Sequence, residues 1–156
     1  MPKFLTLNEA FAKCKKEGKF IPLSEIDNDK IKSSVSIAQG DFDAGKILKN
    51  SISKESMQWN SVYKLHYDAL HSLVGAFLRV DKVKSENHQC LFAYLCEKHQ
   101  ELEFDWDFFE KIRTKRNGIN YYGTSVNQVD WKDVELQLTL YFNKLKKEIE
   151  RKTHSY

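Results

Sequence analysis

The segment VYKLHYDALHSLVGAFLRV, residues 62–80, decides the fold of this chain. Apolar side chains recur through it at spacings of three and four residues, which place them on one face of a helix. No proline interrupts the run, so the helix can continue for about five turns. We therefore predict a long helix from near Ser53 to about Val80. Its predicted core face consists of Val62, Leu65, Ala69, Leu70, Leu73, Val74 and Phe77.

Helical periodicity also dominates the rest of the chain, and strand signals are nearly absent. Short turns between long amphipathic helices favour antiparallel neighbours. We predict an all-α, up-and-down antiparallel bundle of about five long helices plus a short N-terminal helix. The further helices are expected at residues 7–16, 28–50, 86–99, 105–122 and 127–151. Residues 1–27 are predicted to be an accessory segment, and residues 28–152 the bundle itself.

Composition limits the class of protein without naming a function. A chain of 156 residues with 41% hydrophobic side chains is long enough for one domain with a core. The net charge of +3 permits contact with nucleic acid but does not argue for it.

The cysteines and the N-terminus bear on the compartment. Cys14, Cys90 and Cys96 show no paired spacing, and we expect all three to be reduced. The first residues lack the apolar run of a signal peptide, and no stretch reaches the roughly 18 apolar residues of a membrane helix. We expect a cytoplasmic protein with no membrane partner.

Common enzyme signatures are missing from the sequence. It contains no glycine-rich phosphate loop, no GxSxG and no HExxH, and it offers no zinc motif, so we predict no metal and no cofactor. His66 and His71 are expected in the core or an interface, and His99 and His154 at the surface. His88 follows Lys84 at a helix start, where it is either an ordinary polar residue or an anion-facing one.

The stretch RTKRNGINYYG, residues 113–123, carries the most unusual polar pattern. On a helix, Arg113, Arg116, Asn117 and Asn120 share one face, because they lie at i, i+3, i+4 and i+7. Guanidinium and carboxamide groups together suit phosphates or base edges. Alternatively, the arginines pair with carboxylates on a neighbouring helix, and Asn117-Gly118 ends the helix.

Four segments, residues 31–46, 67–78, 84–95 and 116–123, together resemble the HEPN family (higher eukaryote and prokaryote nucleotide-binding domains). The resemblance implies a compact helical bundle that commonly dimerises. Its active members are metal-independent ribonucleases, often toxins, defence factors or RNA-processing factors. Their signature is an arginine, a polar residue, and a histidine four to six residues after the arginine. By resemblance, Arg116 is that arginine and Asn117 the polar residue.

The sequence departs from this signature at the histidine. Where the histidine is expected, the sequence has Asn120, Tyr121, Tyr122 and then Gly123, and none of these is a histidine. Tyrosine is a poor general base near neutral pH, although it can stack on a base. The catalytic candidates are therefore only Arg116 and Tyr121. The predicted binding residues for RNA or nucleotide are Arg113, Arg116, Asn117, Asn120, Tyr121, Lys84 and His88.

Three functional hypotheses follow. The first is a noncatalytic HEPN-like protein that binds RNA, a nucleotide or a nucleotidyltransferase-type partner, with a toxin–antitoxin or defence role. The second is a divergent metal-independent ribonuclease that uses Arg116 with Tyr121, or with His88 brought close in the fold. The third is a structural homodimer. The apolar seam at Val134, Leu138, Tyr141, Leu145 and Ile149, together with Trp59, Trp106 and Trp131, suggests a homodimer under all three hypotheses.

Overall fold

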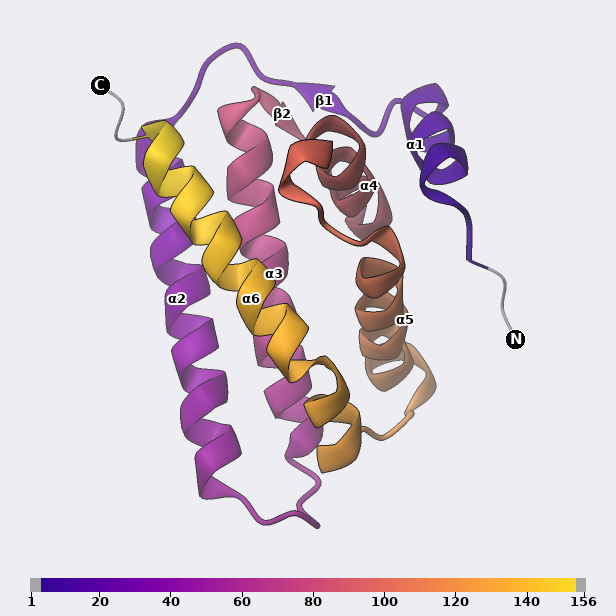
Figure 1. The fold of residues 1–156 in the computed structure, drawn as a ribbon, viewed down its shortest axis with the longest axis vertical. Coiled ribbons are helices and arrows are strands. Elements are labelled where there is room, and N and C mark those ends of the chain that lie inside the picture. Colours follow the sequence, from indigo (N-terminus) through magenta and orange to yellow (C-terminus); the bar gives the residue numbers. More distant parts are fainter. Residues whose placement is uncertain (1–3, 154–156) are drawn as a thin grey trace.

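The computed structural model describes residues 4–153 and confirms an all-α, up-and-down antiparallel bundle (Figure 1). A two-stranded antiparallel sheet, β1 with β2, is the only sheet among these residues. In chain order the elements are α1 (Leu7–Lys16), β1 (Ile21–Pro22), α2 (Asn28–Ser51), α3 (Trp59–Val80), β2 (Val83–Lys84), α4 (His88–Lys98), the 3-10 helix η1 (Gln100–Leu102), α5 (Trp106–Tyr122) and α6 (Gln128–Thr153).

Helix α3 lies at the centre of the bundle. It contacts α2, α4, α5 and α6; in Figure 1, α2 lies on one side of it, α4 and α5 lie on the other, and α6 crosses in front of it. Of its predicted core face only Leu65 is half-buried, whereas the other six side chains are buried. No helix within residues 4–153 combines the length and the apolar character needed to cross a bilayer.

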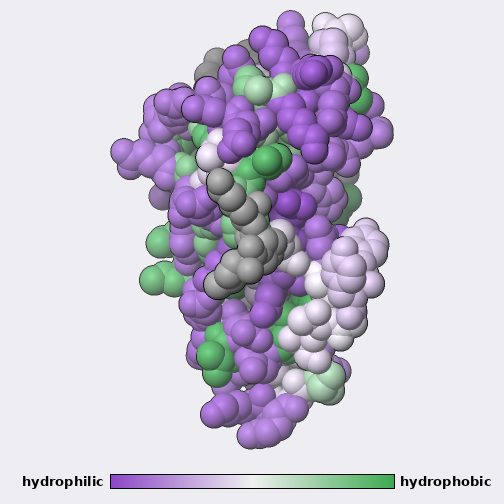
Figure 2. All heavy atoms as spheres, turned by 90° about the vertical axis from the view of Figure 1, so that its right-hand side faces the viewer, coloured by the Kyte–Doolittle hydropathy of each residue, from purple (hydrophilic) through white to green (hydrophobic). Residues whose placement is uncertain are grey.

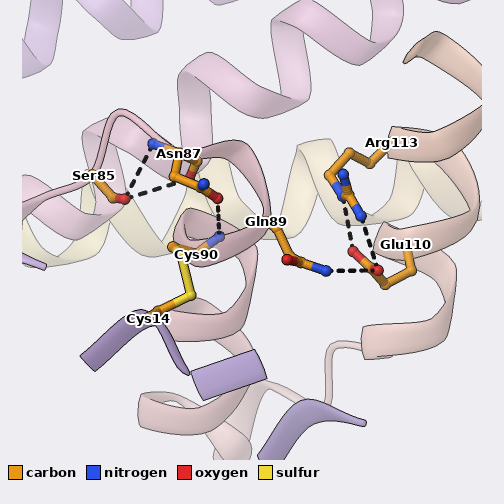
Figure 3. The surroundings of a disulfide bond; sticks show 7 residues. All are labelled: Cys14, Ser85, Asn87, Gln89, Cys90, Glu110 and Arg113. Carbon is orange, nitrogen blue, oxygen red and sulfur yellow. Dashed lines mark hydrogen bonds and ion pairs between the residues drawn. A yellow bond between two sulfur atoms is a disulfide. The ribbon is translucent and has the colours of Figure 1, made fainter. Parts of the chain in front are cut away.

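Side-chain caps set the starts of α2, α4 and α5. The carboxylate of Asp27 accepts a hydrogen bond from the Lys30 N–H at 3.0 Å. Asn87 accepts from the Cys90 N–H at 2.9 Å, as Figure 3 shows, and Asp105 caps α5 in the same manner. These caps satisfy N–H groups that a helix start leaves without partners, so they fix where each helix begins.

The predicted start of the central helix near Ser53 is wrong. Helix α3 begins at Trp59, and Gln58 offers it no side-chain cap. The Trp59 ring is buried, and its Nε1 donates to the Ser53 carbonyl at 3.0 Å. The Ser56 hydroxyl accepts from the Gln58 N–H, which closes a turn. Residues 52–58 therefore form the connection between α2 and α3.

The N-terminal segment is held on α4 and α5 by contacts of several kinds. Helix α1 packs against α4, and the Phe20 ring lies 5.5 Å from the Tyr94 ring. Trp106 Nε1 donates to the Leu5 carbonyl at 2.9 Å. The short β1–β2 ladder then pairs Ile21 with Lys84.

A disulfide between Cys14 and Cys90 contradicts the prediction that all three cysteines are reduced (Figure 3). The two residues are 76 positions apart, so sequence spacing gave no sign of the pair. Packing of α1 on the start of α4 brings their Cα atoms to 5.6 Å, within the range that a disulfide requires. Cys96 is free and buried.

His99 is buried, which contradicts its predicted surface position. Its side chain lies between the Phe77 ring and two carboxylates, those of Asp81 and Glu101. The hydrogen bond to Asp81 holds the pKa of His99 above its ordinary value. The prediction for His154 concerns a position outside residues 4–153.

The features that suggested a homodimer are used inside this one chain. The side chains of Trp59, Trp106 and Trp131 are all buried. The seam of α6 packs against α3, and only Tyr141 in it is half-buried. The burial of these residues thus needs no second copy of the chain.

Gly45 allows α2 to approach the imidazole of His66 closely. A Cβ atom at position 45 would lie 2.5 Å from Cε1 of that ring. The ring cannot easily move, because Nδ1 bonds to the Val62 carbonyl at 2.7 Å and the Trp131 ring lies 4.2 Å away. By contrast, a Cβ at Gly40 would meet nothing within 4 Å.

We predict opposite effects for two glycine substitutions on α2. Gly45→Ala should lower the free energy of unfolding by about 1–3 kcal/mol, because the added methyl overpacks the His66 site. Gly40→Ala should raise the free energy of unfolding by about 0.5–1 kcal/mol, because alanine has a higher helix propensity than glycine and the added methyl meets no neighbour. Urea unfolding of the wild-type chain and of both variants measures the two changes in the free energy of unfolding. Equal stabilisation by both would contradict the close approach at Gly45.

We also predict that Cys14→Ser destabilises the protein. Loss of a crosslink that spans 76 residues should cost about 4 kcal/mol, chiefly through the added freedom of the unfolded chain. Thermal melting with and without reductant provides the measurement. Reductant should lower the melting temperature of the unmodified chain but not that of the variant; an unchanged wild-type melting temperature would speak against the disulfide.

Candidate functional site

A surface pocket of about 220 Å³ lies between the start of α4 and the second half of α5. Figure 3 shows three of its residues: Asn87, which caps α4, Gln89 on α4, and Arg113 on α5. All seven lining residues are polar or aromatic: Asn87, His88, Gln89, Arg113, Arg116, Asn117 and Tyr121. Five of them belong to the predicted site.

Helix α5 is longer than one of the sequence hypotheses allowed. It does not end at Asn117-Gly118 but continues to Tyr122, where Gly123 adopts a left-handed conformation with φ of 65°. Its N–H donates back to the Gly118 carbonyl, a common helix ending. The added turn places Tyr121 at the pocket, with 72% of its surface exposed.

Arg113 is committed to a structural contact inside the pocket wall. Its Nε and Nη2 donate to the two oxygens of Glu110 at 2.9 and 3.0 Å, and Gln89 donates to the same carboxylate (Figure 3). Glu110 is only 1% exposed, so this carboxylate depends on its partners. Arg113 therefore positions Glu110 and contributes little net charge to the pocket.

Arg116 is held less tightly. Its Nη2 lies 3.5 Å from Oδ1 of Asp68, a long contact with a carboxylate that is 43% exposed. The guanidinium also lies over the Tyr67 ring at 5.5 Å. With the Asn120 carboxamide oriented so that its oxygen faces Arg116, it accepts from Nη1 and Nε at 3.0 and 3.1 Å. These partners orient the guanidinium, and the weak Asp68 contact is one that an anion can replace.

Tyr67 connects the arginine to a pair of histidines. Its hydroxyl lies 3.0 Å from Nδ1 of His88, while its ring is fully buried under Arg116. The His88 ring stacks on His71, with centroids 3.9 Å apart. His71 Nε2 is buried, and within residues 4–153 it has no hydrogen-bond partner. Arg116, Tyr67 and the two imidazoles thus form one contiguous cluster.

The environment of this cluster keeps both imidazoles neutral. Burial, together with the nearby charge of Arg116, lowers the pKa of His88. Burial lowers the pKa of His71 to about 3, and the neighbouring His88 and Arg116 act in the same direction. Burial also raises the pKa of the Asp68 carboxyl, against the effect of Arg116. Two stacked imidazolium ions beside a guanidinium would repel one another, which agrees with these directions.

The structure separates the predicted site residues into three groups. Arg113, Arg116, Asn117, Tyr121 and His88 line the pocket together. Asn120 is exposed and contacts Arg116 from outside the lining. Lys84 is not part of this pocket and lines a different one beside His71. Lys84 and His88, which the sequence places close together before and at the helix start, thus line different pockets, and the cations that line the pocket with His88 are Arg113 and Arg116.

Sequence reasoning missed the supporting residues. Tyr67 and His71 lie four residues apart on the central helix, and so fall on one helix face, with Asp68 beside Tyr67. That polar cluster inside a strongly apolar helix was an available signal. Glu110 and Gln89 carried no such signal, because their roles depend on how α4 meets α5.

The arrangement is suited to holding an anion. Asn87, His88 and Gln89 form the cap and the first two positions of α4, where backbone N–H groups point outward and the helix dipole is positive. Arg116 adds a charged, planar donor, and Tyr121 adds an exposed ring on which a base can stack. Within residues 4–153 no cluster of histidine, cysteine and carboxylate side chains is suited to a metal ion.

No protein-family model matches this chain, and neither a curated protein nor a solved structure matches it.

We predict that His71 makes the protein less stable in acid. The unfolded chain takes up a proton at His71 near pH 6.5, whereas the folded chain does so only near pH 3. Between these pH values the unfolded state binds more protons, so the free energy of unfolding falls as pH falls. His71→Phe should flatten this dependence in denaturation series from pH 7 to pH 4.

His99 provides the control for that prediction, because its pKa is raised. Its contribution to stability is present below the unfolded pKa and is lost as pH rises through the folded pKa. His99→Gln should therefore not flatten the acid limb. An identical response of the two variants would contradict the burial of a neutral His71.

Proposed function

We propose that this chain is a divergent HEPN-like protein that binds RNA or a nucleotide in the pocket between α4 and α5, without turning it over. The observation that carries the proposal is the convergence of Arg116, the N-terminal turn of α4 and Tyr121 on one pocket. The first two suit a phosphate and the third suits a base. The resemblance to HEPN proteins at residues 116–123 agrees with this assignment.

Charge balance sets the expected strength of binding. Arg113 is neutralised by Glu110, Arg116 is partly neutralised by Asp68, and His88 is held neutral. An incoming phosphate must compete with Asp68, so affinity should be modest and should weaken as salt rises. The face that carries α1 and α5 is mainly hydrophilic (Figure 2), which suits a charged ligand more than an apolar one.

A metal-independent ribonuclease is the second candidate, and one observation favours it. His88 lies beside Arg116 in the folded chain, although the family's histidine is missing from α5. In the tautomer with its proton on Nδ1, His88 donates to Tyr67 and keeps the lone pair of Nε2. A neutral imidazole next to a phosphate-binding arginine can take a proton from a 2′-hydroxyl.

A homodimer remains part of the proposal, but a different surface supports it. Val129, Leu136 and Leu140 on α6 are 66%, 73% and 57% exposed. Exposed apolar side chains along one helix favour a protein interface. A nucleotidyltransferase-type partner and a toxin–antitoxin or defence role rest on the resemblance alone.

The cytoplasm is the proposed location, as the sequence suggested. Thiols are kept reduced there by glutathione and thioredoxin, so the bond between Cys14 and Cys90 would be open to reduction. Residues 4–27 would then be held on α4 and α5 by noncovalent contacts alone.

Binding of a fluorescent single-stranded RNA at low salt tests the proposal. We expect Arg116→Gln to weaken binding about tenfold to a hundredfold, because a charge-assisted hydrogen bond to phosphate is lost. Lys115→Gln is the matched control. It removes an equal charge from the residue just before Arg116 on α5. Lys115 lines a different pocket, and its Nζ lies 3.6 Å from Oδ1 of Asp130. An equal loss of RNA affinity in both variants would mean that only the total charge of the protein matters, and would contradict a specific role for Arg116.

The same RNA, incubated with a chelator, separates the two candidates. Intact RNA supports binding without catalysis. Cleavage that disappears in both Arg116→Gln and His88→Asn supports the ribonuclease. If RNA and nucleotides fail to bind and Arg116→Gln only lowers the melting temperature, the arginine has a structural role and both candidates fail.

A further inference from the structure

A second pocket, of about 260 Å³, lies between α2, α3 and the β2–α4 connection. Three cationic side chains converge on it from three elements: Lys30 near the start of α2, Arg79 in the last turn of α3, and Lys84 in β2. Three serines line it as well: Ser34, Ser72 and Ser85. Its remaining lining residues are His71, Ile37, Gly75, Ala76 and Leu91.

The charge of this pocket is not balanced by protein groups. No carboxylate belongs to its lining. Across residues 4–153, none of the three cations makes an ion pair with a carboxylate. Asp81 is the acidic residue closest to Arg79 in the sequence, and its carboxylate is hydrogen-bonded to His99 and Tyr94. In the α4–α5 pocket, by contrast, each arginine has a carboxylate partner.

We propose that this second pocket binds the terminal phosphate groups of a phosphorylated ligand, as a di- or triphosphate or a phosphomonoester end. Three uncompensated positive charges match a terminal phosphate group, which carries close to two negative charges, or a polyphosphate, which carries more. A phosphodiester within a strand carries only one. The Ser34 and Ser72 hydroxyls supply neutral donors for the remaining phosphate oxygens, whereas the Ser85 hydroxyl already donates to the Asn87 carbonyl.

The two pockets share a wall. His71 lines the second pocket and stacks on His88, which lines the first. Both imidazoles are neutral, so the wall adds no positive charge to either side. The inference deepens the proposed function, on which it rests for the nature of the ligand: a nucleotide or RNA end held by its terminal phosphates. The binding of phosphate itself is testable without the first pocket.

Calorimetric titration of the full chain with inorganic triphosphate at low ionic strength tests the proposal. We expect Arg79→Gln and Lys84→Gln each to weaken binding about tenfold, because each removes one charged donor. Lys46→Gln is the control, since it removes an equal charge from the same helix as Lys30, about 24 Å away along the axis. It should leave binding unchanged. No binding by the unmodified chain, or equal loss in Lys46→Gln, overturns the proposal.

Arg116→Gln separates this inference from the proposed function. It should retain triphosphate binding even where it loses single-stranded RNA. If it abolishes triphosphate binding, the anion occupies the α4–α5 pocket and the second site is refuted.

Two further probes identify the source of the phosphate. Tighter binding of ATP than of an oligoribonucleotide with a 5′-triphosphate points to a free nucleotide. Tighter binding of an oligoribonucleotide with a 5′-triphosphate, relative to the same oligomer with a 5′-hydroxyl, points to an RNA end. Equal binding of the two oligomers would contradict recognition of a terminal phosphate.

Discussion

Burial of α3 among four other helices is the constraint on which the rest of the structure depends. Much of this helix has little access to water, so a buried polar side chain on it gains stability from a partner inside the protein, and His71 Nε2 is the exception within residues 4–153. His66 does so through the Val62 carbonyl, and it needs Gly45 on α2 to make room for its ring. Tyr67 does so through the hydrogen bond to His88, and the guanidinium of Arg116 lies over its ring. The candidate site is thus built on the polar residues of the central helix.

The two pockets differ in the state of their charges, and this difference separates their chemistry. In the first pocket, Arg113 pairs with Glu110 and Arg116 contacts Asp68. The two guanidinium groups are therefore well oriented, but their attraction for an anion is weakened. In the second, Lys30, Arg79 and Lys84 converge without a carboxylate in the lining, so the attraction is strong and less directional. Such a division suits a ligand with a densely charged end and a recognisable base.

The sequence predicted the helices well because periodicity and caps are local properties. The helices predicted at residues 7–16, 28–50 and 105–122 and most core positions of α3 could all be read from residue order. The start of α3 was misplaced because Trp59 turns its Nε1 back to Ser53, a contact that depends on the burial of the ring. The arginine face of α5 was also correct as a helical face, but its partners were not predictable.

The sequence by itself determined an all-α antiparallel bundle and an Arg/Asn face on α5, since both follow from spacing along one helix. Only the tertiary structure decided which groups meet across helices. It joined Cys14 to Cys90 over 76 positions, buried His99, moved Lys84 to a second pocket, and set His88 beside Arg116. These outcomes depend on the angles and offsets at which α1, α4 and α5 dock on their neighbours. Side-chain packing over the whole core fixes those offsets, and no local pattern encodes them.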